Sequence, residues 1–503
     1  MRSLPLGLLA VCCWGIGFAS LLPVPVLAQS EAEGSRSEQV IVLEQQSRSD
    51  ACATQAAELQ AAEESTVLEQ ELLAQNSTSK KPASKPAKKP APKTGSKTGS
   101  KTQAAVKDSS AAAEPWPQYL GPDRNNISRE TGLARSWPEG GPPLVWKADG
   151  LGAGYSAVSV AQGMVFTMGL VGDEEVILAR KLESGEAVWQ TPIGPGFREG
   201  QGDGPRATPT IDGDFAYSMG ANGDLVCCEI KTGQVAWKKN ILQEFGGGNI
   251  TWGICESVFI DGDKLICTPG GSRATMAALN KSTGKTLWTC QAPGNPRPGY
   301  ASVVPIEVSG VRQYVQFVSA GTMGVRAKDG KFLWADTDSA NPTANCSSAV
   351  FQDNMVFTAS GYGKGAAMLR LTSRGGVTTS QFGYHTNDMK NHHGGLVCLN
   401  GHVYGSNDPG VLVCLELATG KVKWQDRSVG KGSVTCADGM LILRSENGPL
   451  ALVEATPDAY RELGRFEQPE RSGRSSWPYP VVADKKLFLR DQDKLFCFDI
   501  KAP

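Results

Sequence analysis

The sequence predicts an all-β protein, an eight-bladed β-propeller of four-stranded antiparallel blades that follows a long N-terminal extension. Two repeated features predict this fold. The first is the phrase Thr-Gly-x-x-x-Trp, or a close variant, which ends at Trp189, Trp237, Trp288, Trp334 and Trp424. The second is a two-residue turn signal that recurs at residues 162–163, 212–213, 261–262, 309–310, 353–354, 400–401, 438–439 and 484–485. Eight turns imply eight blades.

Each phrase predicts a tight turn followed by a strand that carries a large aromatic residue. The glycine supplies the positive φ of the turn. A single four-stranded sheet buries too little apolar surface to be stable alone, so we expect these tryptophans to be buried between neighbouring blades. In two units the tryptophan is missing, and Phe382 and Phe466 stand near its expected place.

The N-terminal strand of the propeller is predicted to close the ring. The last repeat ends at Pro503 without its aromatic strand, whereas Trp146 stands alone, 43 residues before Trp189. Pairing the segment around Trp146 with the last repeat completes the eighth blade and removes two exposed sheet edges.

The residues before the propeller divide into three segments. Residues 1–28 combine Arg2, a long apolar stretch and Val26-Leu27-Ala28, which predicts a secretory signal peptide; an uncleaved membrane anchor is the alternative. Residues 29–79 are of low complexity and either partly helical or unstructured. Residues 80–115 form a Lys/Pro-rich disordered linker, interpreted as a spacer or as a basic arm that contacts anionic envelope polymer. The propeller then spans 116–503, and we expect an exported protein of the periplasm or cell envelope.

Charge and cysteine usage narrow the class of protein further. The chain has 50 basic and 51 acidic residues, so nothing favours a nucleic-acid partner. Removal of residues 1–28 would leave 11 of the 13 cysteines. Cys227, Cys414 and Cys497 take matching places in their repeats, which indicates buried core thiols in preference to a disulfide framework.

Candidate site residues come from the geometry of a propeller. The innermost strand of each blade begins at one mouth of the central channel, so the residues just before it face a shared pocket. Counting back from the turns gives Tyr155, Arg206, Glu256, Ser302, Asn345, His392, His393, Lys431 and Trp477, with Trp252 nearby.

We interpret this set as a pocket for an anionic or sugar-like ligand. Arg206 and Lys431 would supply positive charge, Glu256 and Asn345 would accept hydrogen bonds, and Trp252 or Trp477 would stack on the ligand. The alternative is that these side chains only tie loops together around a water-filled channel.

No catalytic residue and no metal site are predicted. The four histidines lie within 18 residues, but adjacent His392 and His393 in an extended segment point to opposite sides. The chain contains no Gly-x-Ser-x-Gly elbow, no His-Glu-x-x-His pair and no phosphate loop ending in Gly-Lys-Ser/Thr.

The repeat phrase resembles the pyrroloquinoline-quinone-like (BamB-like) β-propeller repeat family over about residues 116–500. The phrases Trp116-Pro117-Gln118-Tyr119, Asn391-His392-His393-Gly394-Gly395 and Val429-Gly430-Lys431-Gly432-Ser433 resemble a bacterial subfamily of it. The resemblance implies two functions. One is a non-catalytic scaffold that binds a protein, peptide or glycan of the envelope, with a role in outer-membrane protein assembly. The other is an alcohol or sugar dehydrogenase that uses pyrroloquinoline quinone with calcium, for which Glu256 and Asn345 would be oxygen ligands.

Two departures count against the dehydrogenase. In quinoprotein dehydrogenases a vicinal disulfide stacks on the cofactor, but Cys227 of the pair Cys227-Cys228 occupies a core position repeated in other blades. No Cys-x-x-Cys-His haem site is present. We therefore expect a monomeric binding scaffold without a cofactor.

Overall fold

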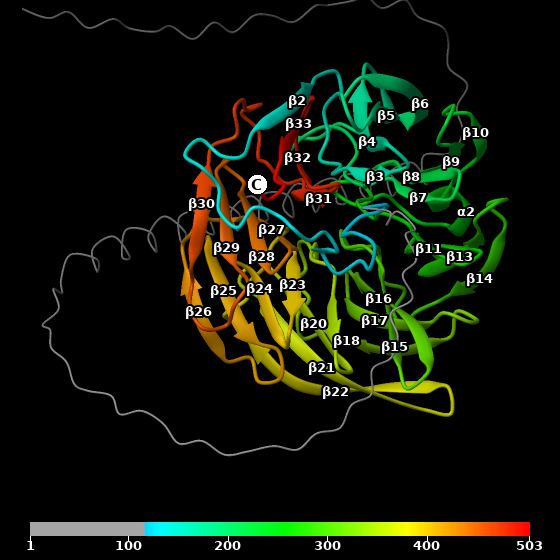
Figure 1. The fold of residues 1–503 in the computed structure, drawn as a ribbon. Helices are drawn as coiled ribbons and strands as arrows, with labels where there is room; N and C mark the ends of the chain where they lie inside the picture. The colour runs from blue at the N-terminus through cyan, green and yellow to red at the C-terminus, as the bar shows by residue number, and fades with distance from the viewer. Residues whose placement is uncertain (1–115) are drawn as a thin grey trace, which may run out of the picture. The chain divides into compact units, whose positions relative to one another are not determined.

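The computed structural model describes residues 116–503 (Figure 1). The predictions for residues 1–115, a signal peptide, a low-complexity segment and a linker, lie outside the described residues. Between residues 116 and 503, no helix has the length and apolar character needed to cross a membrane.

The described residues form the eight antiparallel blades that the turn signals predicted. The first strands of adjacent blades contact one another around the centre of the ring, and the fourth strands lie at the rim (Figure 1). Blade 1 comprises β3 (Ser159–Ala161), β4 (Met164–Val171), β5 (Glu174–Lys181) and β6 (Ala187–Pro195). Blade 2 comprises β7 (Thr210–Asp212), β8 (Phe215–Met219), β9 (Asp224–Glu229) and β10 (Val235–Asn240). A short helix, α2 (Ile241–Phe245), follows β10.

The next four blades repeat this meander. Blades 3 and 4 comprise β11 (Phe259–Asp261), β12 (Lys264–Cys267), β13 (Met276–Asn280), β14 (Thr286–Cys290), and β15 (Val304–Val308), β16 (Val311–Val318), β17 (Gly321–Arg326), β18 (Phe332–Asp336). Blades 5 and 6 comprise β19 (Val350–Gln352), β20 (Met355–Ser360), β21 (Gly365–Arg374), β22 (Val377–Thr386), and β23 (Leu396–Leu399), β24 (His402–Asn407), β25 (Val411–Glu416), β26 (Val422–Asp426).

The last two blades both include a strand from the start of the propeller. Blades 7 and 8 comprise β27 (Gly432–Ala437), β28 (Met440–Ser445), β29 (Leu450–Glu454), β30 (Glu462–Phe466), and β31 (Val481–Ala483), β32 (Lys486–Asp491), β33 (Lys494–Asp499). In blade 7, β1 (Ile127–Ser128) pairs in parallel with β27. In blade 8, β2 (Leu144–Ala148) pairs antiparallel with β33 and places Trp146 opposite Cys497. The predicted closure of the ring by the N-terminal strand is confirmed.

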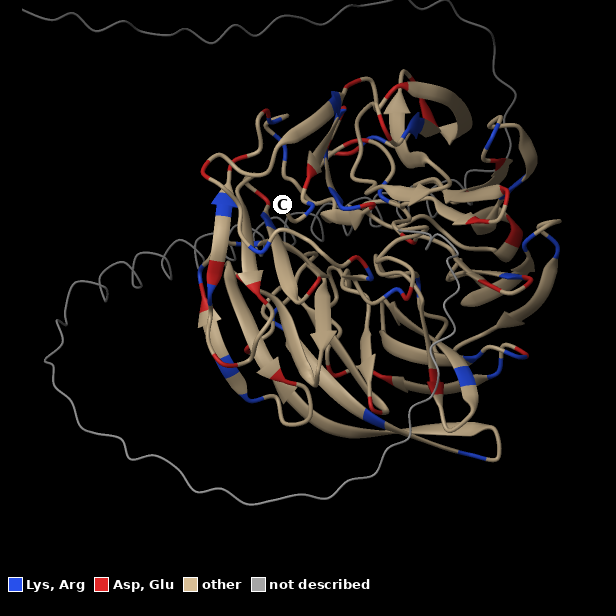
Figure 2. Cartoon of the chain, viewed as in Figure 1, with Lys and Arg blue, Asp and Glu red and all other residues tan. Residues whose placement is uncertain are grey.

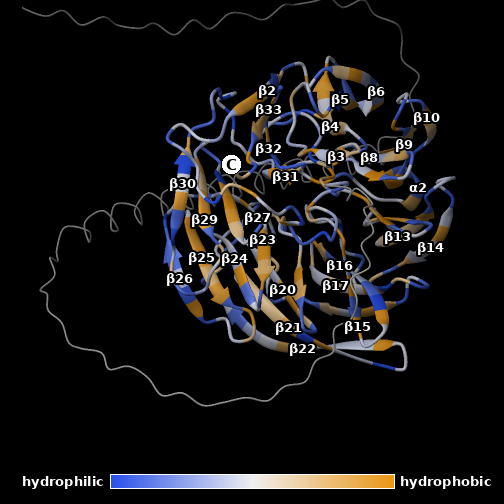
Figure 3. Ribbon diagram, viewed as in Figure 1, coloured by the Kyte–Doolittle hydropathy of each residue, from blue (hydrophilic) through white to orange (hydrophobic). Residues whose placement is uncertain are grey.

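Hydrophobic residues follow the strands of the blades (Figure 3). Their buried side chains form clusters that span neighbouring blades. Lys, Arg, Asp and Glu are interspersed over loops and outer strands (Figure 2). All ten cysteines between residues 116 and 503 are free thiols. Cys227, Cys414 and Cys497 are buried directly opposite Trp237, Trp424 and Trp146, so the prediction of core thiols at a repeated position is confirmed.

The repeated tryptophans join neighbouring blades. Trp189 illustrates the contact: its ring covers Gly233 of the next blade, where an added Cβ would lie 2.7 Å from the indole. The indole Nε1 also donates a 2.7 Å hydrogen bond to the carbonyl oxygen of Ile230. Trp146 and Trp334 are buried, whereas Trp189, Trp237, Trp288 and Trp424 are half-buried on outer strands at the rim. This corrects the expectation that all six are buried. Trp334 is better covered because the long strand β22 of the next blade lies against β18.

The two phenylalanines do not occupy the tryptophan position. In blade 5, Tyr384 stands opposite Met368, where six of the other blades have tryptophan, and its hydroxyl donates to the carbonyl oxygen of Leu417 at 2.8 Å. Phe382 is 51% exposed. In blade 7 the position is Gly464, and Trp137 from the N-terminal segment packs onto it. Phe466 is buried two residues later, with its ring 5.2 Å from that of Trp137.

One feature of the fold was not predicted: residues 116–128 cross the central channel (Figure 1, cyan). Trp116 exchanges backbone hydrogen bonds with Val160, and the carbonyl oxygen of Pro117 accepts one from Ile211. Farther along, the side chain of Asn126 donates to the carbonyl oxygen of Val434. These contacts reach the first strands of blades on both sides of the ring. We call residues 116–128 the plug.

Candidate functional site

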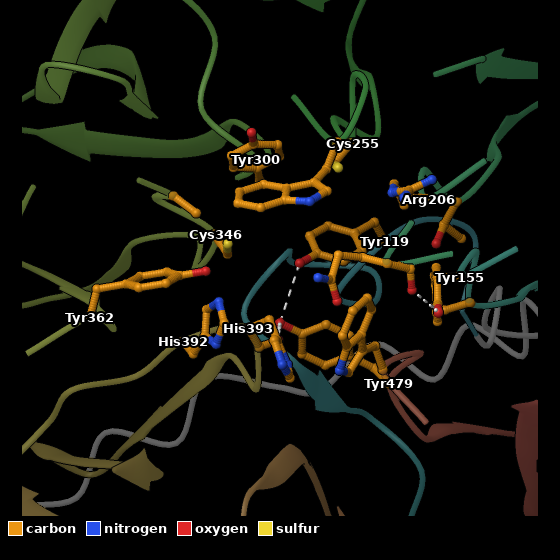
Figure 4. Close-up of a pocket in the computed structure, with 16 residues that line it drawn as sticks. Tyr119, Tyr155, Arg206, Cys255, Tyr300, Cys346, Tyr362, His392, His393 and Tyr479 are labelled. Carbon is orange, nitrogen blue, oxygen red and sulfur yellow. Dashed lines mark hydrogen bonds between the residues drawn. The ribbon is translucent and has the colours of Figure 1, made fainter. Parts of the chain in front are cut away.

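A cavity of about 270 Å³ opens at the channel mouth where the first strands begin (Figure 4). We call this cavity the cup. Six of the predicted mouth residues line it, namely Tyr155, Arg206, Trp252, His392, His393 and Trp477. The prediction missed the other ten lining residues, namely Tyr119, Ala157, Gln201, Thr208, Cys255, Tyr300, Ala344, Cys346, Tyr362 and Tyr479.

The plug supplies the floor of the cup. Tyr119 comes from the plug, and its hydroxyl lies 3.4 Å from the hydroxyl of Tyr479 (Figure 4). The Tyr479 hydroxyl also lies within hydrogen-bond distance, 3.2 Å, of the carbonyl oxygen of His393. Because residues 116–128 occupy the channel behind Tyr119, a ligand enters and leaves the cup on one side of the ring.

Four predicted residues do not line the cup. Glu256 is buried, and its carboxylate accepts hydrogen bonds from the backbone nitrogen of Thr268 at 2.7 Å and from Gln316 at 3.1 Å. The Ser302 hydroxyl accepts from the backbone nitrogen of Ser257. The Asn345 amide bonds within its own loops, and Lys431 lies behind His392.

Two of the missed residues are immediate neighbours of predicted ones. Cys255 precedes Glu256 and Cys346 follows Asn345. Successive side chains of an extended segment point to opposite sides, so an error of one residue exchanges a cup-lining side chain for one that supports a loop. Tyr119 belongs to a phrase that the sequence singled out, but nothing in that phrase indicated that it enters the channel.

The basic groups of the cup are each matched by a carboxylate. Arg206 donates to Glu199 at 2.7 Å and to the carbonyl oxygen of Gly202 at 2.8 Å. Its guanidinium also lies over the rings of Tyr155 and Phe197, at 5.6 and 5.2 Å. Both placements hold Arg206 against the wall and turn its charge toward protein groups.

On the other side of the cup, Lys431 lies 3.1 Å from Asp408 and 2.9 Å from Nδ1 of His392. Burial, with His393 and Lys431 nearby, lowers the pKa of His392 to about 3, so its imidazole is neutral. Its Nδ1 therefore accepts from the ammonium, which leaves the ring proton on Nε2. The Nε2 of His393 pairs with Glu446, whose carboxylate also accepts from the indole of Trp477 at 3.0 Å.

Aromatic rings make a continuous band around these pairs. Tyr155 and Trp477 lie 4.5 Å apart, His393 and Trp477 5.0 Å, and Tyr362 and His392 4.7 Å, measured between ring centroids. Trp252 and Tyr300 form a separate pair at 5.4 Å. The cup thus offers broad ring faces and neutral polar edges.

The thiols in the wall are not poised for chemistry. Burial raises the pKa of Cys255 to about 11 and that of Cys346 well above its ordinary value, which keeps both protonated at neutral pH. Within residues 116–503, no three or more His, Cys, Asp or Glu side chains gather where they could hold a metal ion. The arrangement is suited to binding.

Two curated relatives match short parts of the chain. The outer membrane protein assembly factor BamB of Salmonella typhimurium (strain LT2) is 26% identical over 145 residues, which is 27% of this chain and 31% of that protein. The Escherichia coli (strain K12) protein of the same name is 24% identical over 121 residues, 24% of this chain and 28% of its own. Each match spans less than a third of the relative.

Among solved structures, the computationally designed Ika8 protein covers 71% of this chain and 100% of its own, with 11% identity and a TM-score of 0.51, and it supports the shared fold. BamB from Moraxella catarrhalis covers 66% of this chain and 95% of its own, with 13% identity and a TM-score of 0.44. Quinohemoprotein alcohol dehydrogenase from Comamonas testosteroni covers 78% of this chain and 81% of its own, with 12% identity and a TM-score of 0.48.

The family comparison reaches farther along the chain. The sequence model described as outer membrane protein assembly factor BamB matches residues 143–250, 172–426 and 366–460, which together exceed half of the chain. The chain belongs to the BamB-like family of pyrroloquinoline-quinone-like repeat β-propellers.

Proposed function

We propose that this protein is a non-catalytic binding scaffold of the cell envelope, which recognises a protein, peptide or glycan through the cup. The observation that carries the proposal is the composition of the cup wall. Its rings lie open to the cavity, while its ionised groups are engaged with one another, as in Arg206 with Glu199 and Lys431 with Asp408. Convergent rings with a few polar groups between them are typical of ligand sites.

The name of the family supports a role in the assembly of outer-membrane proteins. The matched parts of the curated relatives are short, so this role is proposed from the family as a whole and from no particular residue.

The alternative of a quinone-dependent dehydrogenase fits the residues poorly. Calcium would need oxygen ligands at the cup, but the carboxylate of Glu256 is occupied by Thr268 and Gln316. Cys227 and Cys228 lie buried in β9, paired with β10, and neither lines the cup. We therefore assign no step to a quinone.

A photo-cross-linking amino acid at the cup rim tests the proposal in the full-length protein. Tyr362, 49% exposed, lines the cup, and Val377 on the β21–β22 hairpin is exposed to a similar degree outside it. We expect a cross-linked envelope component from position 362, lost with Trp477→Ala, and none from position 377. Identical products from both positions would reject the cup as the binding site. Dye-linked dehydrogenase activity of the parent protein with added quinone and Ca²⁺ would reject a non-catalytic role.

A further inference from the structure

We infer that the cup binds a neutral ring rich in hydroxyl groups, the terminal pyranose of a glycan. The inference rests on the proposed function in one respect, that the cup is a binding site, and it names the class of ligand.

The charges around the cup argue against an ionic ligand. An anion would have to compete with Glu199 for Arg206 or with Asp408 for Lys431, and a cation would have to compete with His393 for Glu446. Separating these partly buried pairs would leave polar groups without their partners, so the wall discriminates against both signs. This replaces the earlier interpretation that Arg206 and Lys431 attract an anion.

The rings provide stacking surfaces on two sides of the cavity. Trp252 packs with Tyr300, and Trp477 packs with Tyr155. In Figure 4, Tyr300 and Tyr362 stand on one side of the cavity and Tyr155 and Tyr479 on the other. The C–H face of a pyranose is apolar and flat enough to lie against such rings, while its hydroxyls project from the edge.

The edges between the rings carry groups that suit hydroxyls. Tyr300, Tyr362 and Thr208 bring hydroxyls, Gln201 brings a carboxamide, and His392 has its Nε2–H. Sugar hydroxyls both donate and accept, and so do most of these groups. A purely aromatic ligand such as a tryptophan side chain would cover the rings, but it would also shield these polar groups from water without giving them hydrogen-bond partners, which costs affinity.

The size of the cup and its floor limit the ligand to the end of a chain. Ligand pockets usually measure roughly 300–1,000 Å³, and this one, at about 270 Å³, has room for one or two sugar units. Tyr119 and the rest of the plug block passage through the channel. A glycan therefore enters by its terminus and cannot thread through the ring.

Calorimetric titration of the full-length protein tests the inference. The probes are glucose, galactose, mannose, N-acetylglucosamine, cellobiose and maltose, with glucuronic acid, glucosamine and N-acetyltryptophanamide for comparison. We expect at least one neutral sugar to bind with a Kd below about 1 mM. It should bind at least tenfold more tightly than the charged sugars and the amide. Trp477→Ala and Trp252→Ala, one in each ring pair, should each weaken binding at least tenfold, whereas exposed Phe382→Ala outside the cup should not.

Three results would overturn the inference: tighter binding of a charged sugar, tighter binding of the tryptophan amide, or no neutral sugar bound by the folded protein. Circular dichroism establishes folding of each variant, and Trp477→Phe, which retains a ring, provides a second variant if Trp477→Ala does not fold. Failure here leaves the proposed function standing if Tyr362 still yields a cross-link that depends on Trp477; loss of that cross-link rejects the proposed function itself.

Discussion

The indole Nε1 of Trp189 donates a hydrogen bond to the carbonyl oxygen of Ile230 across the boundary between blades 1 and 2. Trp237 and Trp424 repeat this bond to Lys281 and Thr456 in their next blades. Trp288 differs, because its Nε1 is buried among the described residues without a hydrogen-bond partner. The same residue at the same place in the repeat thus makes different contacts.

This difference predicts unequal costs for the same substitution. Trp189→Phe removes a hydrogen bond and leaves a carbonyl unpaired, whereas Trp288→Phe removes no bond. Both lose ring area, but we expect Trp189→Phe to lower the free energy of unfolding by about 1 kcal/mol more than Trp288→Phe does. Urea unfolding of the two variants measures the difference, and equal losses would show that the indole hydrogen bond contributes nothing.

In blade 5 the ring that joins the blades belongs to Tyr384. It covers Gly420, where a Cβ would lie 2.5 Å from the tyrosine ring, and it bonds Leu417 through its hydroxyl. We expect Tyr384→Ala to lower the free energy of unfolding by about 3 kcal/mol. Phe382→Ala, two residues away and exposed, should change it by less than about 0.5 kcal/mol. A larger loss for Phe382→Ala than for Tyr384→Ala in urea unfolding would show that Phe382 is the residue that joins the blades.

The sequence predicts the arrangement of the blades correctly but does not predict Tyr384 as the joining residue of blade 5. The number of blades, their order and the closure by Trp146 follow from repeats, because each blade must present the same turn and the same ring to its neighbour. In blade 5 the strands β21 and β22 each run for ten residues, and their hairpin reaches blade 4, where Arg326 donates to the carbonyl oxygen of Gly376. The longer hairpin adds residues before Tyr384, so its ring does not stand at the regular repeat interval from the preceding tryptophan. Counting by that interval therefore selects Phe382 in place of Tyr384.

The cup is predicted less completely for a different reason. Counting residues locates the loops at the mouth, but the side that each residue faces depends on the pleating of the backbone. For this reason Cys255 lines the cup, whereas the predicted neighbour Glu256 points away from it and bonds Thr268. The plug follows from no repeat, because residues 116–128 occur once and their contacts are to strands far away in the sequence.

Glu175 makes stability depend on pH. It is buried, it accepts from the backbone nitrogen of Ala221 at 2.8 Å, and burial raises its pKa from 4.5 to about 7. The folded state therefore holds this proton more tightly than the unfolded state does. Its contribution to stability is complete below pH 4.5 and is lost as the pH rises through 7, by up to about 3 kcal/mol.

Glu175→Gln removes this titration and keeps an oxygen for Ala221. Between pH 5 and pH 8 we expect the free energy of unfolding of Glu175→Gln to fall less than that of the parent, when both are measured in urea. Glu183→Gln in an exposed turn is the control and should follow the parent. Burial also raises the pKa of Glu256 to about 7, so part of the decline should persist in Glu175→Gln and become smaller when Glu256→Gln is added. Parallel curves for Glu175→Gln and the parent would contradict the prediction.

Arg124 fastens the plug to two blades. Its guanidinium is buried and donates to the carbonyl oxygens of Ser257 at 2.6 Å and Val303 at 3.0 Å, and it lies 5.1 Å from the ring of Phe259. Arg124→Met keeps the apolar stem but leaves these carbonyls without a donor, so we expect a loss of about 3 kcal/mol in the free energy of unfolding and faster amide hydrogen exchange in residues 116–128.

Arg129→Met is the matched control just beyond the plug. Arg129 pairs with Asp123 at 2.6 Å but is 62% exposed, so its replacement should cost less than about 1 kcal/mol. If neither substitution accelerated exchange, the plug would be held by its backbone contacts, and the floor of the cup would not depend on Arg124.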